Sequence, residues 1–123
     1  QARGGGREDI LGMIDRLETK WLFGHVETMV MAVLARGDLH PYALRRELAE
    51  RTAGRVRPSF GSLFPLLGRK LEKQRLVRSR LRKAGPRRQR RVFTLTAKGR
   101  RELRERRDRW QRLARSIHAV LNA

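Results

Sequence analysis

Apolar residues recur every three or four positions along most of the chain, and this spacing predicts helices rather than strands. The first apolar stripe falls within residues 8–23, whose acidic first turn suits the start of a helix. A second stripe begins near His25 and ends where Gly37 supplies a stop signal. The pattern therefore predicts two helices, preceded by a flexible tail over residues 1–7.

Two further helices are predicted in the middle of the chain. Pro41 stands at the first position of the third helix, where its missing N–H costs no hydrogen bond, and Gly54 closes that helix. Ser59 is the expected N-cap of the fourth helix, which runs to Arg75.

The spacing changes after the fourth helix. Residues 76–82 and 91–95 are predicted to form two short strands, joined into a hairpin by the turn sequence KAGPRR. Thr96 then caps a last helix that runs to about Leu121.

This order of elements predicts a fold class. Three helices followed by a basic hairpin form the winged helix-turn-helix plan, which is mainly α with a small β-hairpin wing. We expect the DNA-binding domain to span residues 24–96, between an N-terminal helix over 8–23 and a C-terminal dimerisation helix over 97–123.

The fourth helix has two unlike faces, and its start is unusual. The expected core face comprises Phe60, Leu63, Phe64, Leu67 and Leu71. The opposite stripe comprises Ser59, Ser62, Leu66, Arg69 and Lys73. Small residues there allow close approach to a phosphate backbone, and hydroxyl and N–H groups can bond phosphate oxygens. An ordinary core helix explains the leucines but not Gly61 and Pro65, which suit a helix end pressed against nucleic acid.

The charge of the chain points to an anionic partner. Its 31 Lys and Arg residues against 12 Asp and Glu give a net charge of +19. Nucleic acid is therefore the first candidate partner and an anionic membrane the second. Arg87, Arg88 and Arg90 lie at or near the predicted hairpin tip, where we expect contacts to phosphate rather than to bases.

Other kinds of site lack the residues that they need. The sequence has no Cys, which excludes disulfides and zinc–thiolate sites. Its three histidines, His25, His40 and His118, lie far apart, so we expect neither a metal site nor catalysis, and no cofactor. The longest apolar run is too short to cross a bilayer, and the first residues lack the apolar region of a secretion signal. The expected location is the cytoplasm.

Three motifs resemble one known family. The stretches LARGDLHPYALRREL (34–48), SFGSLFPLL (59–67) and RRVFTLTAKGRREL (90–103) look like the PadR-like winged-helix transcriptional regulators. The resemblance covers about residues 24–103 and has all three motifs in the family's order.

The sequence departs from the family pattern at several positions. Phe64 and Phe93 replace tyrosines, and Pro41 and Arg75 replace glycines. One extra residue stands between Arg69 and Leu71. A regular helix would then have its end rotated by about 100°, whereas a one-residue bulge near Gly68 would absorb the insertion.

The resemblance implies homodimerisation through the last helix and the partner's N-terminal helix. An apolar stripe of near-heptad spacing supports this expectation. The expected dimer residues are Ile14, Leu17, Trp21, Leu103, Trp110, Leu113, Ile117, Val120 and Leu121. In some family members a tryptophan of this helix lines a pocket for planar aromatic ligands. Trp110 stands at a matching place, either as part of such a pocket or as interface core.

These observations predict a dimeric regulator, a repressor, that binds a pseudo-palindromic operator in double-stranded DNA. The expected DNA contacts are Tyr42, Ser59, Gly61, Ser62, Leu66, Arg69, Arg87, Arg88 and Arg90. A nonspecific nucleoid or RNA-binding protein is the alternative that the charge alone permits. A protein-interaction or ligand-sensing module with little affinity for DNA is a third class.

Overall fold

The computed structural model describes residues 24–123 of the chain. The predicted tail and N-terminal helix lie outside the described residues, and so do the dimer residues expected there, Ile14, Leu17 and Trp21. The first described helix covers residues 24–34, includes Gly24, and ends three residues before the predicted stop at Gly37. Its valines and leucine enter the core, where Val30 and Met31 are fully buried.

Helix α2 (Pro41–Arg51) begins where the proline predicted it. His40 is its N-cap, and the ring Nδ1 accepts a hydrogen bond from the N–H of Ala43 at 3.1 Å. Leu44 and Leu48 point into the core, as their spacing predicted. The helix ends at Arg51, and Gly54 follows in the left-handed region with φ of 81°. The predicted helix end is therefore late by three residues.

The fourth helix is built from two different segments. Helix α3 (Phe60–Pro65) is an α-helix, and the segment η1 (Leu66–Glu72) continues it as a π-helix. Backbone hydrogen bonds in a π-helix span five residues rather than the four of an α-helix, so a π-helical segment accommodates an inserted residue without turning the rest of the helix away. Of the two outcomes that the sequence left open, the bulge is confirmed, and Lys70 is the additional residue.

The buried face of this helix differs from the predicted one at two positions. Leu66 was expected on the exposed stripe but is 3% exposed, whereas Phe64 was expected in the core and is 47% exposed. The buried residues are Leu63, Leu66, Leu67 and Leu71. The first three fall at i, i+3 and i+4, and the π-helical turn brings Leu71 onto the same face. The four leucines form an apolar stripe as unbroken as the predicted one. The prediction for Leu66 was wrong because it counted Phe64 in the core, which placed Leu66 on the opposite face.

Arg75 ends the helix in a conformation that favours glycine. Its φ is +62°, its N–H donates to the carbonyl of Glu72 at 2.9 Å, and the N–H of Leu76 donates to Leu71 at 2.9 Å. The left-handed region costs a residue with a Cβ about 1–2 kcal/mol. This strain explains why the family pattern has glycine at the position that Arg75 occupies.

We expect Arg75→Gly to stabilise the fold by about 0.5–1 kcal/mol, because relief of the strain outweighs the greater freedom of glycine in the unfolded chain. Thermal unfolding would measure the change. Lys73→Gly is the matched control, since Lys73 has a helical φ of −60° and glycine there should destabilise. Equal effects of the two substitutions would contradict this reading of Arg75.

The hairpin is longer than predicted. Strands β1 (Val77–Gly85) and β2 (Arg88–Leu95) pair antiparallel, with Val77 opposite Leu95 and an irregularity between Lys83 and Gly85. Most of the expected six-residue turn therefore continues the strands, because their backbone groups pair with each other. Leu39 forms an isolated antiparallel β-bridge with Phe93 through two backbone hydrogen bonds, at 3.2 and 2.9 Å. This bridge fixes the base of the wing to the segment between the first helix and α2.

Helix α4 (Ala97–Leu121) begins and ends as predicted, with Thr96 as its N-cap. The Thr96 hydroxyl accepts from the N–H of Gly99 at 2.9 Å and donates toward the carbonyls of Arg75 and Leu76, at 2.7 and 3.0 Å. Gly99 lies so close to this junction that a Cβ would stand 2.1 Å from the Leu76 carbonyl oxygen. The start of α4 therefore depends on a residue without a side chain at this position.

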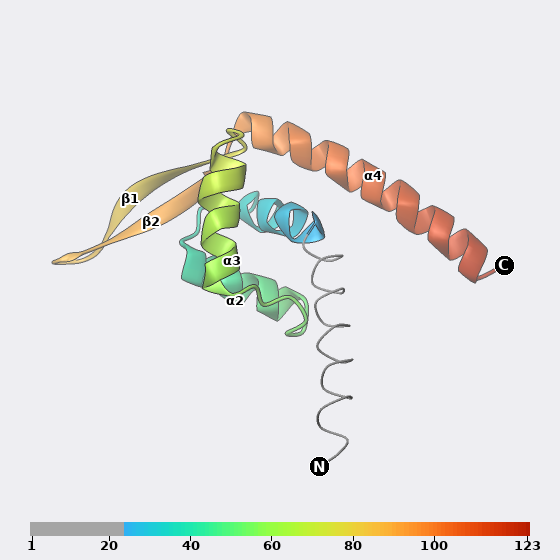
Figure 1. The fold of residues 1–123 in the computed structure, drawn as a ribbon, viewed down its shortest axis with the longest axis horizontal. Helices are drawn as coiled ribbons and strands as arrows, with labels where there is room; N and C mark the ends of the chain where they lie inside the picture. The colour runs from blue at the N-terminus through green and yellow to red at the C-terminus, as the bar shows by residue number, and fades with distance from the viewer. Residues whose placement is uncertain (1–23) are drawn as a thin grey trace, which may run out of the picture.

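The core lies where the helices over 24–34, α2, α3 and η1 meet the base of the hairpin, and the wing and α4 leave it in opposite directions (Figure 1). Leu103 is 4% exposed and belongs to this core. It was predicted as a dimer residue, but α4 is still packed on its own subunit at this point. The exposed apolar part of α4 begins further along, at Trp110.

Candidate nucleic-acid interface

The start of α3 is a capped helix end that faces solvent. The Ser59 hydroxyl oxygen accepts from the N–H of Ser62 at 3.2 Å, and the Ser59 carbonyl accepts from Leu63 N–H at 2.8 Å. The two serine hydroxyls lie 3.2 Å apart. This cap holds the first turn in place while leaving hydroxyl groups at a positively polarised helix end, where an anion is favoured.

One exposed stripe runs along α3 and into η1. It comprises Gly61, Phe64, Pro65 and Gly68, at i, i+3, i+4 and i+7, with Arg69 beside it. A Cβ built on Gly68 would meet nothing within 4 Å, and one on Gly61 would meet only the Ser59 hydroxyl, at 3.8 Å. The packing of the described residues therefore does not require glycine at either position.

An aromatic row continues from this stripe onto α2. The ring of Phe60 lies 5.9 Å from that of Phe64 and 4.7 Å from that of Tyr42. The guanidinium of Arg45 lies 5.1 Å above the Phe60 ring, and its Nε donates to the Pro58 carbonyl at 2.8 Å. Tyr42 is 59% exposed. A basic hollow of about 400 Å³ lies along this row, with Arg46 and Arg57 also in its wall.

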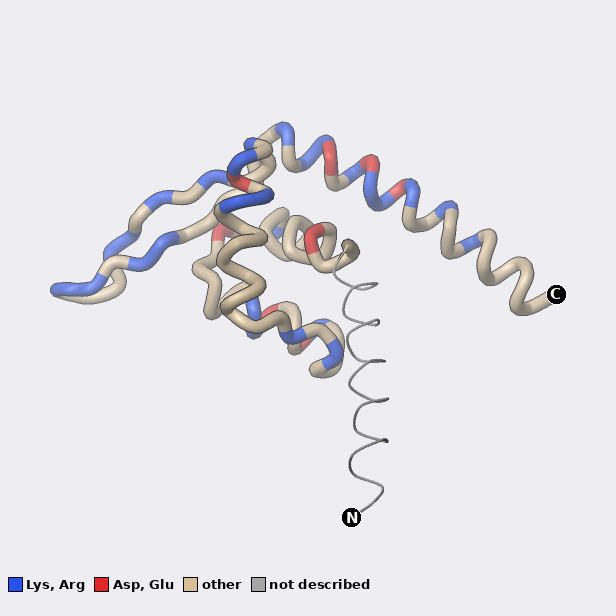
Figure 2. Tube along the Cα trace, viewed as in Figure 1, with Lys and Arg blue, Asp and Glu red and all other residues tan. Residues whose placement is uncertain are grey.

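The wing carries cations along both strands. Between 77 and 95 there is no Asp or Glu, and Figure 2 shows basic residues along the whole hairpin. The cations are Arg78, Arg80, Arg82, Lys83, Arg87, Arg88, Arg90 and Arg91. Arg82 stands directly opposite Arg90 in the ladder, a like-charge pair that an anion between them would relieve.

The wing cations differ in whether they have partners in the part of the chain that the structure describes. Arg80 pairs with Asp38 at 3.1 Å, and Arg91 donates to the Ser79 hydroxyl at 2.9 Å. Arg87 and Arg88, at the tip, form no ion pair with any described residue. Arg78, Arg82 and Lys83 are likewise exposed and form no ion pair with any described residue, so the tip arginines belong to a larger set of wing cations available for an external anion.

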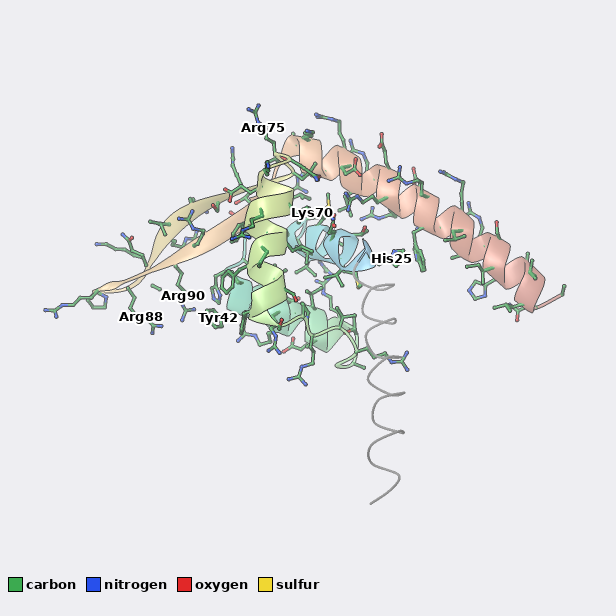
Figure 3. The ribbon with its side chains drawn as sticks, in the orientation of Figure 1. His25, Tyr42, Lys70, Arg75, Arg88 and Arg90 are labelled. Carbon is green, nitrogen blue, oxygen red and sulfur yellow. The ribbon has the colours of Figure 1, made fainter. Side chains whose placement is uncertain are left out.

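Arg90 lies between the wing and the start of α2, on the same side of the molecule as Tyr42 (Figure 3). Its Nη1 is 2.9 Å from the Nε2 of His40, whose Nδ1 accepts the capping bond. A neutral imidazole accepts at one nitrogen only, so the two contacts compete. Burial, and then the charges of Arg90 and Arg46, lower the pKa of His40. Arg90 therefore shares the His40 ring with the N–H of Ala43, and only one of the two can donate to a neutral ring nitrogen.

The structure places most of the predicted DNA-contacting residues at the surface. Tyr42, Ser59, Gly61, Arg69, Arg87 and Arg88 are exposed, and Ser62 and Arg90 are partly exposed. Leu66 is in the core. Sequence reasoning missed Phe64, although its place three residues after Gly61 was a signal for the exposed stripe.

A second candidate site lies between the first described helix and α4. The groove has a volume of about 600 Å³ and is lined by His25, Glu27, Met29, Arg106, Trp110 and Leu113, among others. The rings of His25 and Trp110 have their centroids 5.1 Å apart. This geometry combines an aromatic wall with cationic groups.

A buried carboxylate beside the groove joins three elements. Glu27 is 5% exposed, pairs with Lys70 of η1, and accepts from Arg106 of α4 at 3.3 Å. Arg106 also bonds Glu102 at 2.7 Å. Without either partner the buried carboxylate would be left uncompensated, at a cost of about 3–5 kcal/mol, so this cluster fixes α4 and η1 against the first helix. The inserted residue, Lys70, therefore has a structural role as a partner of Glu27, which the sequence did not reveal.

Two kinds of feature are absent from residues 24–123. These residues contain no helix long and apolar enough to cross a membrane. They also contain no group of three His, Asp or Glu side chains that could hold a metal ion.

The elements around the interface define a class of protein. Three helices, the third at the surface, are followed by a two-stranded wing whose base is bridged to Leu39, and this is a winged helix-turn-helix domain. The sequence matches the transcriptional regulator PadR-like family over residues 30–105. The chain belongs to this family of transcriptional regulators.

Solved structures share the fold. A PadR family transcriptional regulator from Eggerthella lenta is 27% identical, with a TM-score of 0.67, and the match covers 94% of this chain and 92% of that one. A PadR-like regulator from Bacillus cereus is 24% identical with a TM-score of 0.73, covering 85% and 98%. Bacillus subtilis PadR in complex with operator DNA is 21% identical with a TM-score of 0.59, covering 65% and 45%. No match was found among curated proteins.

Proposed function

We propose that this protein is a dimeric repressor that binds a specific operator in double-stranded DNA. The observation that carries the proposal is the exposed stripe along α3 and η1, with two glycines that the packing of the described residues does not require, beside a wing without acids. The structure of Bacillus subtilis PadR with operator DNA supports it, as a relative of the same fold. α3 would enter the major groove, and the wing would lie along the phosphate backbone.

The C-terminal half of α4 supports the dimer. Trp110, Leu113 and Ile117 are each about half exposed, and Val120 and Leu121 are more than 70% exposed. A helical stripe of five large apolar side chains favours self-association over exposure to water. A two-fold dimer would place two α3 helices one turn of DNA apart, which matches a pseudo-palindromic operator.

The groove at Trp110 supports control by a small molecule. A planar aromatic effector could stack on Trp110, and the more exposed Arg109 in the same wall could meet an anionic group on it, because Arg106 is already paired with Glu27 and Glu102. Because Arg106 also bonds Glu27, an effector there would act on the contacts between α4 and η1.

Selection of bound sequences from random duplex DNA, followed by competition in rising salt, would test the function. A regulator should bind the selected operator about 10³-fold or more tightly than unrelated DNA. A nonspecific nucleoid or RNA-binding protein, which the net charge of +19 also permits, would select no sequence. Little affinity for any DNA would favour the third class, a protein-interaction or ligand-sensing module.

Replacing both Arg87 and Arg88 by Ala should weaken binding to operator and unrelated DNA alike. Each lost phosphate contact should also lower the slope of log affinity against log salt by about one. Titrations at several salt concentrations would measure both effects. The matched control removes two exposed charges from α4, Arg101 and Arg104, and should change the slope less. Altered sequence preference with an unaltered slope would mean that the wing reads bases.

A further inference from the structure

Phe64 is a large apolar side chain in the middle of the surface that should face DNA. Its ring is 47% exposed, and the glycines three residues before and four residues after it have no side chains to cover it. Burying apolar surface lowers the free energy, so binding of a partner that covers the Phe64 ring is favoured.

The ring is supported from within and free on its outer side. Phe60 backs it at 5.9 Å, and Tyr42 and Arg45 in turn hold Phe60. The neighbourhood is cationic, because Arg45 lies behind the row and Arg69 follows on the same helix. The ligand that suits this surface is therefore an apolar group flanked by anionic groups. The thymine methyl in the major groove, flanked by phosphates, has this chemistry.

Gly61 and Gly68 provide a second, independent observation. Glycine inside a helix is destabilising relative to alanine, and a Cβ would fit at Gly68 without any contact inside 4 Å. Close approach of a DNA strand to the backbone would account for the absence of both side chains, which the packing of the described residues does not require. Close approach at these two positions would bring the bound molecule against the Phe64 ring, which lies between them.

We propose that Phe64 determines specificity by packing on the C5-methyl group of a thymine in each operator half-site. The proposal rests on the proposed DNA-binding function and adds the base feature that the helix reads. It predicts a preference that comes from apolar contact, in contrast to the phosphate contacts expected of Ser59, Ser62 and the wing.

Deoxyuridine substitution in the selected operator tests the contact, since deoxyuridine differs from thymidine only by the missing methyl. For the wild-type chain, one thymine per half-site should lose about fourfold in affinity when its methyl is removed. The Phe64→Ala variant should bind thymine and deoxyuridine operators equally. Phe64→Leu, which keeps an apolar side chain, should retain part of the preference.

The outcomes separate the failure of this proposal from that of the function. If random DNA yields no operator, the function fails and the proposal with it. If an operator is found but its half-sites contain no thymine that responds to loss of the methyl, the proposal alone is overturned. A Phe64→Ala variant that keeps the full penalty for deoxyuridine overturns it too. If the Phe64→Ala variant also loses self-association while keeping that penalty, the ring belongs to a protein interface rather than to the DNA contact.

Discussion

Replacing Ile117 by Asp should convert the protein to a monomer and lower its affinity for the operator by about 100-fold or more. The side chain is 45% exposed and lies on the α4 stripe with Leu113, Val120 and Leu121, so the fold of the single chain should survive. Full burial of each of these side chains would contribute about 1.5–3 kcal/mol, and an unpaired carboxylate placed in that seam would oppose it strongly. Loss of the second half-site removes the gain from simultaneous binding, which is about 10²–10⁴.

Light scattering and operator titration would measure the two effects on one sample. Ala119→Asp is the matched control, because it adds the same charge two residues away on the opposite, exposed side of α4. It should remain dimeric and bind normally. Weak binding of the Ile117→Asp variant to a single half-site should persist. A wild-type chain that is monomeric at micromolar concentration would refute the dimer and the palindromic operator together.

Replacing Ser62 by Glu should abolish most operator binding without harming the fold. Ser62 is the third residue after the Ser59 cap, so a glutamate there would complete a capping box and support the helix start. The same carboxylate would face DNA phosphate, and like charges brought together cost several kcal/mol. Operator affinity should therefore fall by roughly 100-fold or more.

Ser62→Gln is the control for this charge, because glutamine has the same size, can complete the same cap and is neutral. The thermal midpoints of both variants should equal or exceed that of the wild type, and the affinity of the glutamine variant should fall much less. If glutamate and glutamine bind the operator equally, the start of α3 does not face phosphate. The proposed docking of the helix would then be wrong.

Local signals in the sequence predicted much of this fold. Pro41, Ser59 and Thr96 each begin a helix through chemistry confined to a few neighbouring residues, and all three are confirmed. The long last helix also ends as predicted at Leu121. Such signals are reliable because the capping bond joins residues only three positions apart.

Features that depend on distant residues could not be predicted in the same way. The choice between Leu66 and Phe64 for the core depends on which elements surround the helix, and an apolar pattern alone permits either. The partners of Glu27 come from η1 and α4, far along the chain. The sequence indicated that Gly61 near the start of α3 is unusual, but it could not show that a Cβ there would meet only the Ser59 hydroxyl, at 3.8 Å, among the described residues.

Helix α4 packs closely at its start, where Gly99 lies against the Leu76 carbonyl, and its C-terminal half extends away from the core. The helix has 25 residues and is anchored to its own subunit near its start, so its length is roughly 37 Å at 1.5 Å per residue. A tilt of about 5° at this fulcrum would move the far end by roughly 3 Å. A side chain at position 99 would collide with the Leu76 carbonyl and displace the start of α4, and the helix would carry that displacement to its apolar end. In the proposed dimer, a small change in packing near the junction of α4 and η1 would therefore change the spacing of the two DNA-binding domains without altering either domain.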